Sequence, residues 1–166
     1  DIGEPRREGQ ALRESAWLLL DEGRGDQAWN YGLLAVELAR LVGHLGDEAQ
    51  AWLLTANVLT ELGMPGQAER AYEEALRIQC ELEQLDAMAE SRAGLASLSL
   101  QKGAQDRARD LVEEILDHID GSDLPGARDP VSVYLTCYQV LSAVGDNRAE
   151  DVLGMASRVF DGGAFT

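Results

Sequence analysis

The chain has 166 residues, of which 45% are hydrophobic and 27% are charged, enough for one ordinary domain with a hydrophobic core. Thirty acidic and fourteen basic side chains give a net charge of −16, which argues against duplex DNA, an RNA backbone or an anionic membrane as the partner. No apolar run approaches the ~18 residues that a membrane-spanning helix needs.

Apolar residues recur at helical spacing along the chain. Residues 49–62 show the i, i+3, i+4, i+7 stripe of an amphipathic helix, formed by Trp52, Leu53, Ala56, Leu59 and Leu62. A glycine-containing turn follows at 63–66, and a second apolar helical pattern follows the turn. The same reasoning predicts helices at 8–22, 25–43, 47–62, 65–82, 86–102, 105–119, 130–144 and 147–160.

The helices follow an internal repeat of 40 residues. Three sets of small residues align at this shift: Gly23, Gly63 and Gly103; Ala16, Ala56 and Ala96; Ala28, Ala68 and Ala108. A fourth unit fits with one residue of slippage from Gly145. Helix axes approach within roughly 8–10 Å only where side chains are small, so these alanines predict the crossing point of each antiparallel helix pair.

The second unit resembles a tetratricopeptide repeat. The resemblance rests on Trp52, Thr55-Ala56, Leu59, Gly63, Ala68, Tyr72 and Ala75. The period of 40 exceeds the family's 34, and the proline that usually closes a repeat is missing after Ile78. Both departures are typical of long-helix variants in bacterial regulators. Residues 112–145 are similar to the last repeats of the helical arrays carried by large bacterial signalling ATPases.

Together, the repeat and the resemblance predict an all-α fold. We expect four antiparallel helix pairs stacked as a right-handed α-solenoid, in a single domain spanning 1–166. The predicted repeats cover approximately 9–46, 47–85, 86–126 and 129–160. Because the chain begins with Asp1, we also expect it to be a segment of a longer protein, namely a bacterial regulator.

Residues that could carry chemistry are few. The chain has no Gly-rich phosphate-binding motif, and His44 and His118 each lack the paired ligands that a metal site needs. Cys80 and Cys137 lie within apolar helical patterns, which favours reduced thiols packed as small hydrophobic residues in the cytoplasm. We therefore expect no enzyme activity, no metal and no cofactor.

The concave face of such an array is the candidate binding site, because the first helix of each repeat lines it. The repeat register predicts a peptide-binding groove formed by Arg13, Trp17, Gln50, Leu53, Asn57, Glu61, Glu90, Ser97, Tyr134 and Tyr138. Trp17 is either a recognition anchor or a core residue. Clamp-type recognition of a C-terminal carboxylate is disfavoured, because Glu90 stands where that clamp needs a cation or an amide.

The favoured function is a non-enzymatic interaction module that binds a peptide or a partner helix in this groove. Because the chain is acidic, the partner should combine basic and apolar character. One alternative is self-assembly, including a homodimer through the terminal helices, since the last helix has an apolar face formed by Val152, Leu153, Ala156, Val159 and Phe160. Another alternative is a regulatory domain that senses a small molecule.

The acidic stretch 110–129 contains a single cation, Arg128, and ends in the longest predicted loop. A solvated insertion between the third and fourth repeats explains it most simply. The alternative is an acidic docking patch for a basic partner.

Overall fold

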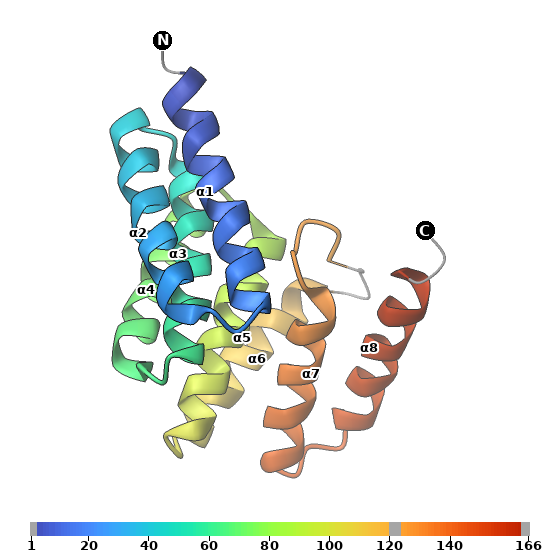
Figure 1. The fold of residues 1–166 in the computed structure, drawn as a ribbon. Helices are drawn as coiled ribbons and strands as arrows, with labels where there is room; N and C mark the ends of the chain where they lie inside the picture. Colours follow the sequence, from blue (N-terminus) through green and yellow to red (C-terminus); the bar gives the residue numbers. More distant parts are fainter. Residues whose placement is uncertain (1–2, 120–123, 164–166) are drawn as a thin grey trace. The chain divides into compact units, whose positions relative to one another are not determined.

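The computed structural model describes residues 3–119 and 124–163, and these residues form eight helices and no strand (Figure 1). The helices are α1 (Gly3–Asp21), α2 (Gly25–Val42), α3 (Leu45–Glu61), α4 (Pro65–Glu81), α5 (Leu85–Gln101), α6 (Gln105–Ile119), α7 (Pro130–Ala143) and α8 (Ala149–Gly163). Consecutive helices pack as adjacent pairs. The predicted all-α fold of the α-solenoid type is therefore confirmed.

The chain divides into two compact units, Asp1–Glu83 with α1–α4 and Gln84–Thr166 with α5–α8. In the first unit, α1 pairs with α2 and α3 pairs with α4, while α2 and α1 both contact α3. In the second unit, α5 pairs with α6 and α7 pairs with α8, while α5 and α6 both contact α7. The division lies close to the predicted boundary between the second and third repeats.

The repeated alanines, which the sequence predicts at the helix crossings, are all buried. Each is 0% exposed: Ala16, Ala28, Ala56, Ala68, Ala96 and Ala108. Ala16 and Ala28 belong to one core cluster of the first unit, and Ala96 and Ala108 belong to the core cluster of the second. A side chain larger than a methyl group at these positions would force the paired helices apart.

Left-handed residues end the helices at the expected turns. The turn glycines have φ between 69° and 76°: Gly23, Gly63, Gly103 and Gly145. Gly43, at the end of α2, has the same conformation with φ of 73°. Forty residues later, Glu83 has φ of 53°, so here a residue with a side chain adopts a backbone conformation that favours glycine.

The helix boundaries agree with the predicted ones to within a few residues, except that α1 begins at Gly3 instead of residue 8. Its first turn is almost entirely polar, so hydrophobic periodicity gives no signal there. A tertiary ion pair accounts for part of the extension, because Arg6 in this turn reaches Asp47 of α3. No helix in the described ranges is both long and apolar enough to cross a bilayer.

The two cysteines differ in their surroundings, and the prediction that both are packed is wrong for one of them. Cys137 is 0% exposed in the core of the second unit, where burial raises the pKa of its thiol to about 12. Cys80 is exposed on the solvent side of α4, whereas the neighbouring residue Gln79 is buried.

The apolar face of α8 is largely covered within its own unit. Val152 and Ala156 are each 3% exposed, and Val159 packs against the same core cluster. Phe160 is 66% exposed, so it alone of these residues remains a large apolar surface.

Candidate functional site

Within each unit, the first helices of consecutive repeats lie beside each other, α1 beside α3 and α5 beside α7. Since the predicted binding residues are on these four helices, each unit has one candidate face. The α1/α3 face comprises Arg13, Trp17, Gln50, Leu53, Asn57 and Glu61, together with Asp21, one turn beyond Trp17 on α1. The α5/α7 face comprises Glu90, Ser97, Tyr134 and Tyr138.

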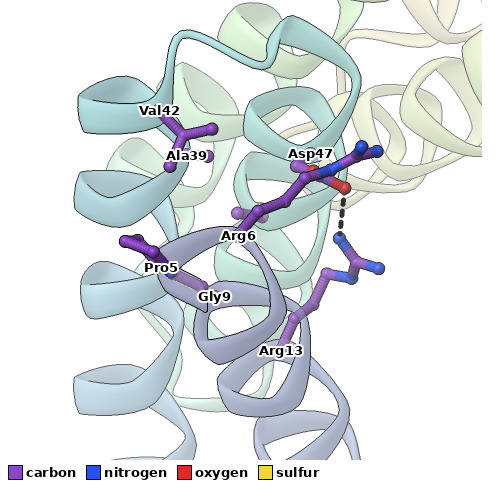
Figure 2. Close-up of a pocket in the computed structure, with 9 residues that line it drawn as sticks. Pro5, Arg6, Gly9, Arg13, Ala39, Val42 and Asp47 are labelled. Atoms are coloured by element: carbon purple, nitrogen blue, oxygen red, sulfur yellow. Dashed lines mark hydrogen bonds and ion pairs between the residues drawn. The ribbon is translucent and has the colours of Figure 1, made fainter. Parts of the chain in front are cut away.

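Asp47, in the first turn of α3, links α3 to α1. Its carboxylate accepts hydrogen bonds from Nε of Arg6 at 2.8 Å and from Nε2 of Gln10 at 3.2 Å. Nη1 of Arg13 lies 3.5 Å from Oδ1 of Asp47, the oxygen that Gln10 also contacts (Figure 2). The Arg13 side chain is only 13% exposed. The cation that the sequence offers to a ligand is therefore paired inside the unit.

His44 caps the same helix. Its Nδ1 lies 3.1 Å from the backbone nitrogen of Asp47 and 2.9 Å from Oδ2 of the Asp47 side chain. An unprotonated Nδ1 accepts the backbone hydrogen and caps α3, whereas a protonated Nδ1 donates to the carboxylate. Burial raises the pKa of Asp47, but hydrogen bonds from Arg6 and Gln10 and the charges of His44 and Arg6 outweigh that effect and hold the pKa below 3.8.

A small hollow lies beside this network, between α1, α2 and the start of α3 (Figure 2). Its lining is mostly apolar apart from the ionic residues: Pro5, Arg6, Gly9, Arg13, Ala35, Ala39, Val42, Asp47 and Ala51. Its volume of 240 Å³ includes space open to solvent. The cavity volume itself is only about 10 Å³. Pockets for drug-sized ligands usually measure about 300–1,000 Å³, so this hollow favours structural packing over small-molecule binding.

The remaining residues of the α1/α3 face divide into exposed and engaged side chains. Gln50 and Glu61 are exposed. Asn57 is half-buried; its amide donates to the Leu53 carbonyl oxygen at 2.9 Å, and its side-chain oxygen accepts a hydrogen bond from the Tyr72 hydroxyl at 3.0 Å. Leu53 is 6% exposed, so its prediction as a ligand contact is wrong.

Trp17 lies between the two predicted alternatives. It is half-buried and packs against the cluster that contains Ala16, Leu54 and Val58. Part of the indole therefore belongs to the core of the first unit, and part of its surface remains accessible. Asp21, one turn further along α1, is exposed. The accessible part of the α1/α3 face thus includes part of Trp17, the Gln50 amide and the carboxylates of Asp21 and Glu61.

The α5/α7 face is much less available than the sequence suggests. Tyr134 is 1% exposed within the core cluster of the second unit, so the prediction that it contacts a ligand is wrong. Tyr138 is half-buried and packs against that cluster. Ser97 is also half-buried, with Nε2 of Gln101 3.4 Å from its hydroxyl oxygen. These residues mainly stabilise the unit.

Glu90 is engaged with the segment that precedes α7. Its Oε1 accepts a hydrogen bond from the backbone N–H of Asp129 at 2.8 Å. One turn earlier on α5, Oδ2 of Asp86 accepts the backbone N–H of Gly126 at 2.7 Å. Burial raises the pKa of Glu90, and the backbone hydrogen bonds from Asp129 and Arg128 offset this only in part. Glu90 therefore positions a loop, and its prediction as a free groove residue is wrong.

Residues 124–129 accordingly form an ordered connection. Leu124 is 2% exposed and belongs to the core of the second unit. The Asp129 side chain accepts the backbone N–H of Ser132 at 3.0 Å and so caps α7, which begins at Pro130. The prediction of a solvated insertion is wrong for Leu124, whereas Pro125, Gly126, Arg128 and Asp129 are exposed as expected. The rest of the predicted acidic loop, residues 120–123, lies outside the described residues.

A second ionic network joins α6 to the turn before α8. Arg148 binds the Glu113 carboxylate with Nη1, at 3.0 Å, and with Nη2. Its Nε and Nη2 donate to Asp146 at 3.0 and 2.7 Å. These hydrogen bonds lower the pKa of Asp146 to about 2 and lower the pKa of Glu113 as well. The arrangement fixes the turn between α7 and α8.

Sequence reasoning missed the ion pairs made by Asp47 and Arg148 and the hydrogen bond that Asp86 accepts from the backbone of Gly126. The spacing from His44 to Asp47 does resemble a helix-capping signal, in which a cap residue and an acid are three positions apart. The partners of Asp86 and Arg148 are 40 and 35 residues away, so local patterns contain no trace of them. Among residues 3–119 and 124–163, no cluster of three or more His, Cys, Asp or Glu side chains could hold a metal ion.

Comparisons with known proteins support the fold. No protein-family model matches the chain. A search of curated proteins also produced no match. The chain is similar in structure to the crystal structure of BtubC (BKLC) from P. vanneervenii, with a TM-score of 0.72 and 23% sequence identity. The match covers 95% of this chain and 65% of the BtubC chain. At this identity, the similarity shows that the two proteins share an all-helical fold.

Proposed function

We propose that the chain is a non-enzymatic protein-interaction module whose α1/α3 face binds a peptide or a partner helix. The observation that carries the proposal is the accessible part of this face. Trp17 is partly exposed, and Gln50, Asp21 and Glu61 are exposed beside it with an amide and two carboxylates. An aromatic anchor surrounded by polar groups is typical of protein recognition sites.

The charges on this face favour a basic partner. Arg13 is paired with Asp47, so its charge does not offset Asp21 and Glu61. The net charge of −16 extends the same field over the whole chain. A segment with Lys or Arg around an apolar anchor would be attracted at long range, and added salt would slow its association.

A random peptide library selected on the purified chain tests the proposal. The recovered peptides should carry Lys or Arg next to an apolar residue. Their affinity should fall at least about tenfold in the Glu61→Lys variant, because the change places a cation on the binding face. Trp17→Ala should also weaken binding while helix content, measured by circular dichroism, is retained.

Asp106→Lys is the matched control, since Asp106 is exposed on α6, lies outside the acidic stretch 110–129, and the substitution changes the net charge equally. It should alter affinity by no more than about twofold. Equal losses in Glu61→Lys and Asp106→Lys would show that only the overall charge matters. Selected peptides that are acidic would contradict the proposal. Unfolding of Trp17→Ala would make Trp17 a core residue and remove the anchor.

Self-assembly is a second candidate, and the 66% exposure of Phe160 on α8 favours it. Sedimentation of the purified chain at increasing concentration distinguishes it from a monomeric module. A dimer that Phe160→Glu dissociates would support assembly through this helix. A monomer at all concentrations would leave the interaction module as the function.

We also propose that the chain is a tetratricopeptide-repeat segment of a larger bacterial regulator and acts in the cytoplasm. The 40-residue repeat and the residues that resemble the family's motif support the family. The exposed thiol of Cys80 and the unpaired thiol of Cys137 suit a reducing compartment. A small-molecule sensor is less well supported, because the hollow beside Asp47 is small.

A further inference from the structure

The outer surface of α2 carries an unusual row of apolar side chains. Tyr31, Leu34 and Leu41 are 39%, 46% and 78% exposed. Half-buried Leu38 lies between them, so the row has spacings of three, four and three residues. We call these four residues the α2 stripe. This spacing is the a/d pattern by which one helix packs along another.

In the next repeat the two most exposed leucine positions of the stripe are polar, whereas the counterparts of Tyr31 and Leu38 are the buried Ala71 and Ile78. A shift of 40 residues places Glu74 at the position of Leu34 and Glu81 at the position of Leu41. Between them, Arg77 forms ion pairs with Glu74 at 3.2 Å and with Glu81 at 2.7 Å. The second helix of a repeat therefore needs no leucine at these positions in order to fold. The leucines of α2 call for another explanation.

One acidic side chain borders the stripe on α2. Glu37 precedes Leu38; its carboxylate is exposed and is not paired with another described residue. On the other side, α1 approaches the stripe closely, since a Cβ added at Gly9 would lie 3.4 Å from the Cβ of Leu38.

The nearby cation of α2 does not neutralise this border. Nε of Arg40 binds Glu48 of α3 at 2.8 Å, and the guanidinium lies 5.2 Å from the Trp52 ring centroid. Arg40 is therefore directed toward α3. The stripe thus combines an apolar seam with an acidic border formed by the exposed Glu37 carboxylate.

We propose that the α2 stripe is a second docking surface, distinct from the α1/α3 face, and that it binds an amphipathic helix with an apolar seam flanked by Lys or Arg. The spacing of the stripe matches a helix with leucine-type residues at its own a and d positions. Its acidic border attracts flanking cations. A second copy of this chain fits less well, because each copy carries a charge of −16.

Two synthetic helical peptides of about twenty residues, long enough to populate a helix in water, provide the probe. Both have leucine at a and d positions; one has lysine at the flanking positions and the other has glutamate. The lysine peptide should bind the chain at least about tenfold more tightly than the glutamate peptide, and added salt should reduce the difference.

The double variant Leu34→Gln/Leu41→Gln removes the two most exposed leucines of the stripe without adding charge, so it should stay folded with a melting temperature close to that of wild type. It should bind the lysine peptide at least about tenfold more weakly. Leu135→Glu is the control, because Leu135 is 39% exposed on α7 in the other unit. Its affinity should change by no more than about twofold.

Glu37→Lys tests the border while leaving the seam intact. It should weaken binding of the lysine peptide and strengthen binding of the glutamate peptide. The proposal is overturned if the double variant binds as well as wild type, if Leu135→Glu weakens binding equally, or if Glu37→Lys affects both peptides alike. Self-association of the wild-type chain that the double variant abolishes would also overturn it, since the occupant would then be a second copy.

Discussion

Gln50 in α3 and Glu90 in α5 occupy the same position of the repeat in the two units, yet their surroundings differ. Gln50 is exposed on the α1/α3 face, whereas Glu90 is half-buried and accepts the backbone N–H of Asp129. The helices around both residues follow the same register. The difference arises from the segment 124–129, which is anchored on α5. Repeat position thus determines where a side chain lies, and the connecting loop determines whether a ligand can reach it.

The largest expected effect concerns what the two units share, the small residues at the helix crossings. Ala68→Leu in the first unit and Ala108→Leu in the second should each reduce the free energy of unfolding by about 1–3 kcal/mol, because both side chains are 0% exposed. Glu73→Leu, on an exposed position, should change it by less than about 0.5 kcal/mol. Equal urea midpoints for the three variants would contradict the repeat register.

A second comparison concerns one backbone position filled by different residues. Gly43 and Glu83 both adopt left-handed backbone conformations, with φ of 73° and 53°. Because this conformation strains any residue with a Cβ, Glu83→Gly should raise stability by up to about 1 kcal/mol and Gly43→Ala should lower it by about 1 kcal/mol. Calorimetric melting of both variants checks this. A loss of stability in Glu83→Gly would show that its side chain makes a compensating contact.

The third prediction probes the loop that distinguishes the units. A Cβ at Gly126 would lie 2.8 Å from Oδ2 and 3.2 Å from Cβ of Asp86, so Gly126→Ala must displace the hydrogen bond between these residues. We expect a loss of about 1 kcal/mol, the usual net contribution of one hydrogen bond. Gly66→Ala, in the first turn of α4 with open space around it, should be neutral or stabilising. The same sign for both variants in urea denaturation would contradict the loop contact.

The smallest effect is a pH dependence. Because the folded-state pKa of Glu90 is raised above 4.5, the folded chain binds this proton more strongly than the unfolded chain. The contribution of Glu90 to stability should therefore decrease as the pH rises from 4.5 through its folded-state pKa. Glu90→Gln removes this titration. The stability of the variant relative to wild type should increase over that pH range, and a decrease would contradict the raised pKa.

The sequence predicts most of the fold, because the repeated alanines, the turn glycines and the apolar periodicity are all local signals. It predicts the candidate site less well. Arg13 and Glu90 have the spacing of face residues, but their partners, Asp47 and Asp129, are 34 and 39 residues away. Tyr134 and Leu53 have the spacing of groove residues too, but both side chains are buried, because an apolar side chain at such a position can pack into the core instead of facing solvent. Long-range ion pairs and loop paths decide these outcomes, and neither leaves a periodic trace in the sequence.

The loop before α7 is anchored on α5 and partly buries Glu90, whereas the equivalent Gln50 of the first unit is exposed. Hydrogen exchange of the Asp129 and Gly126 amides, followed by NMR, tests it most directly. The account predicts that both amides are protected in the wild-type chain, that Glu90→Ala removes the protection at Asp129, and that Gln50→Ala changes neither amide. Exchange of the wild-type Asp129 amide at the rate of an unstructured peptide, or protection that persists in Glu90→Ala, would contradict it.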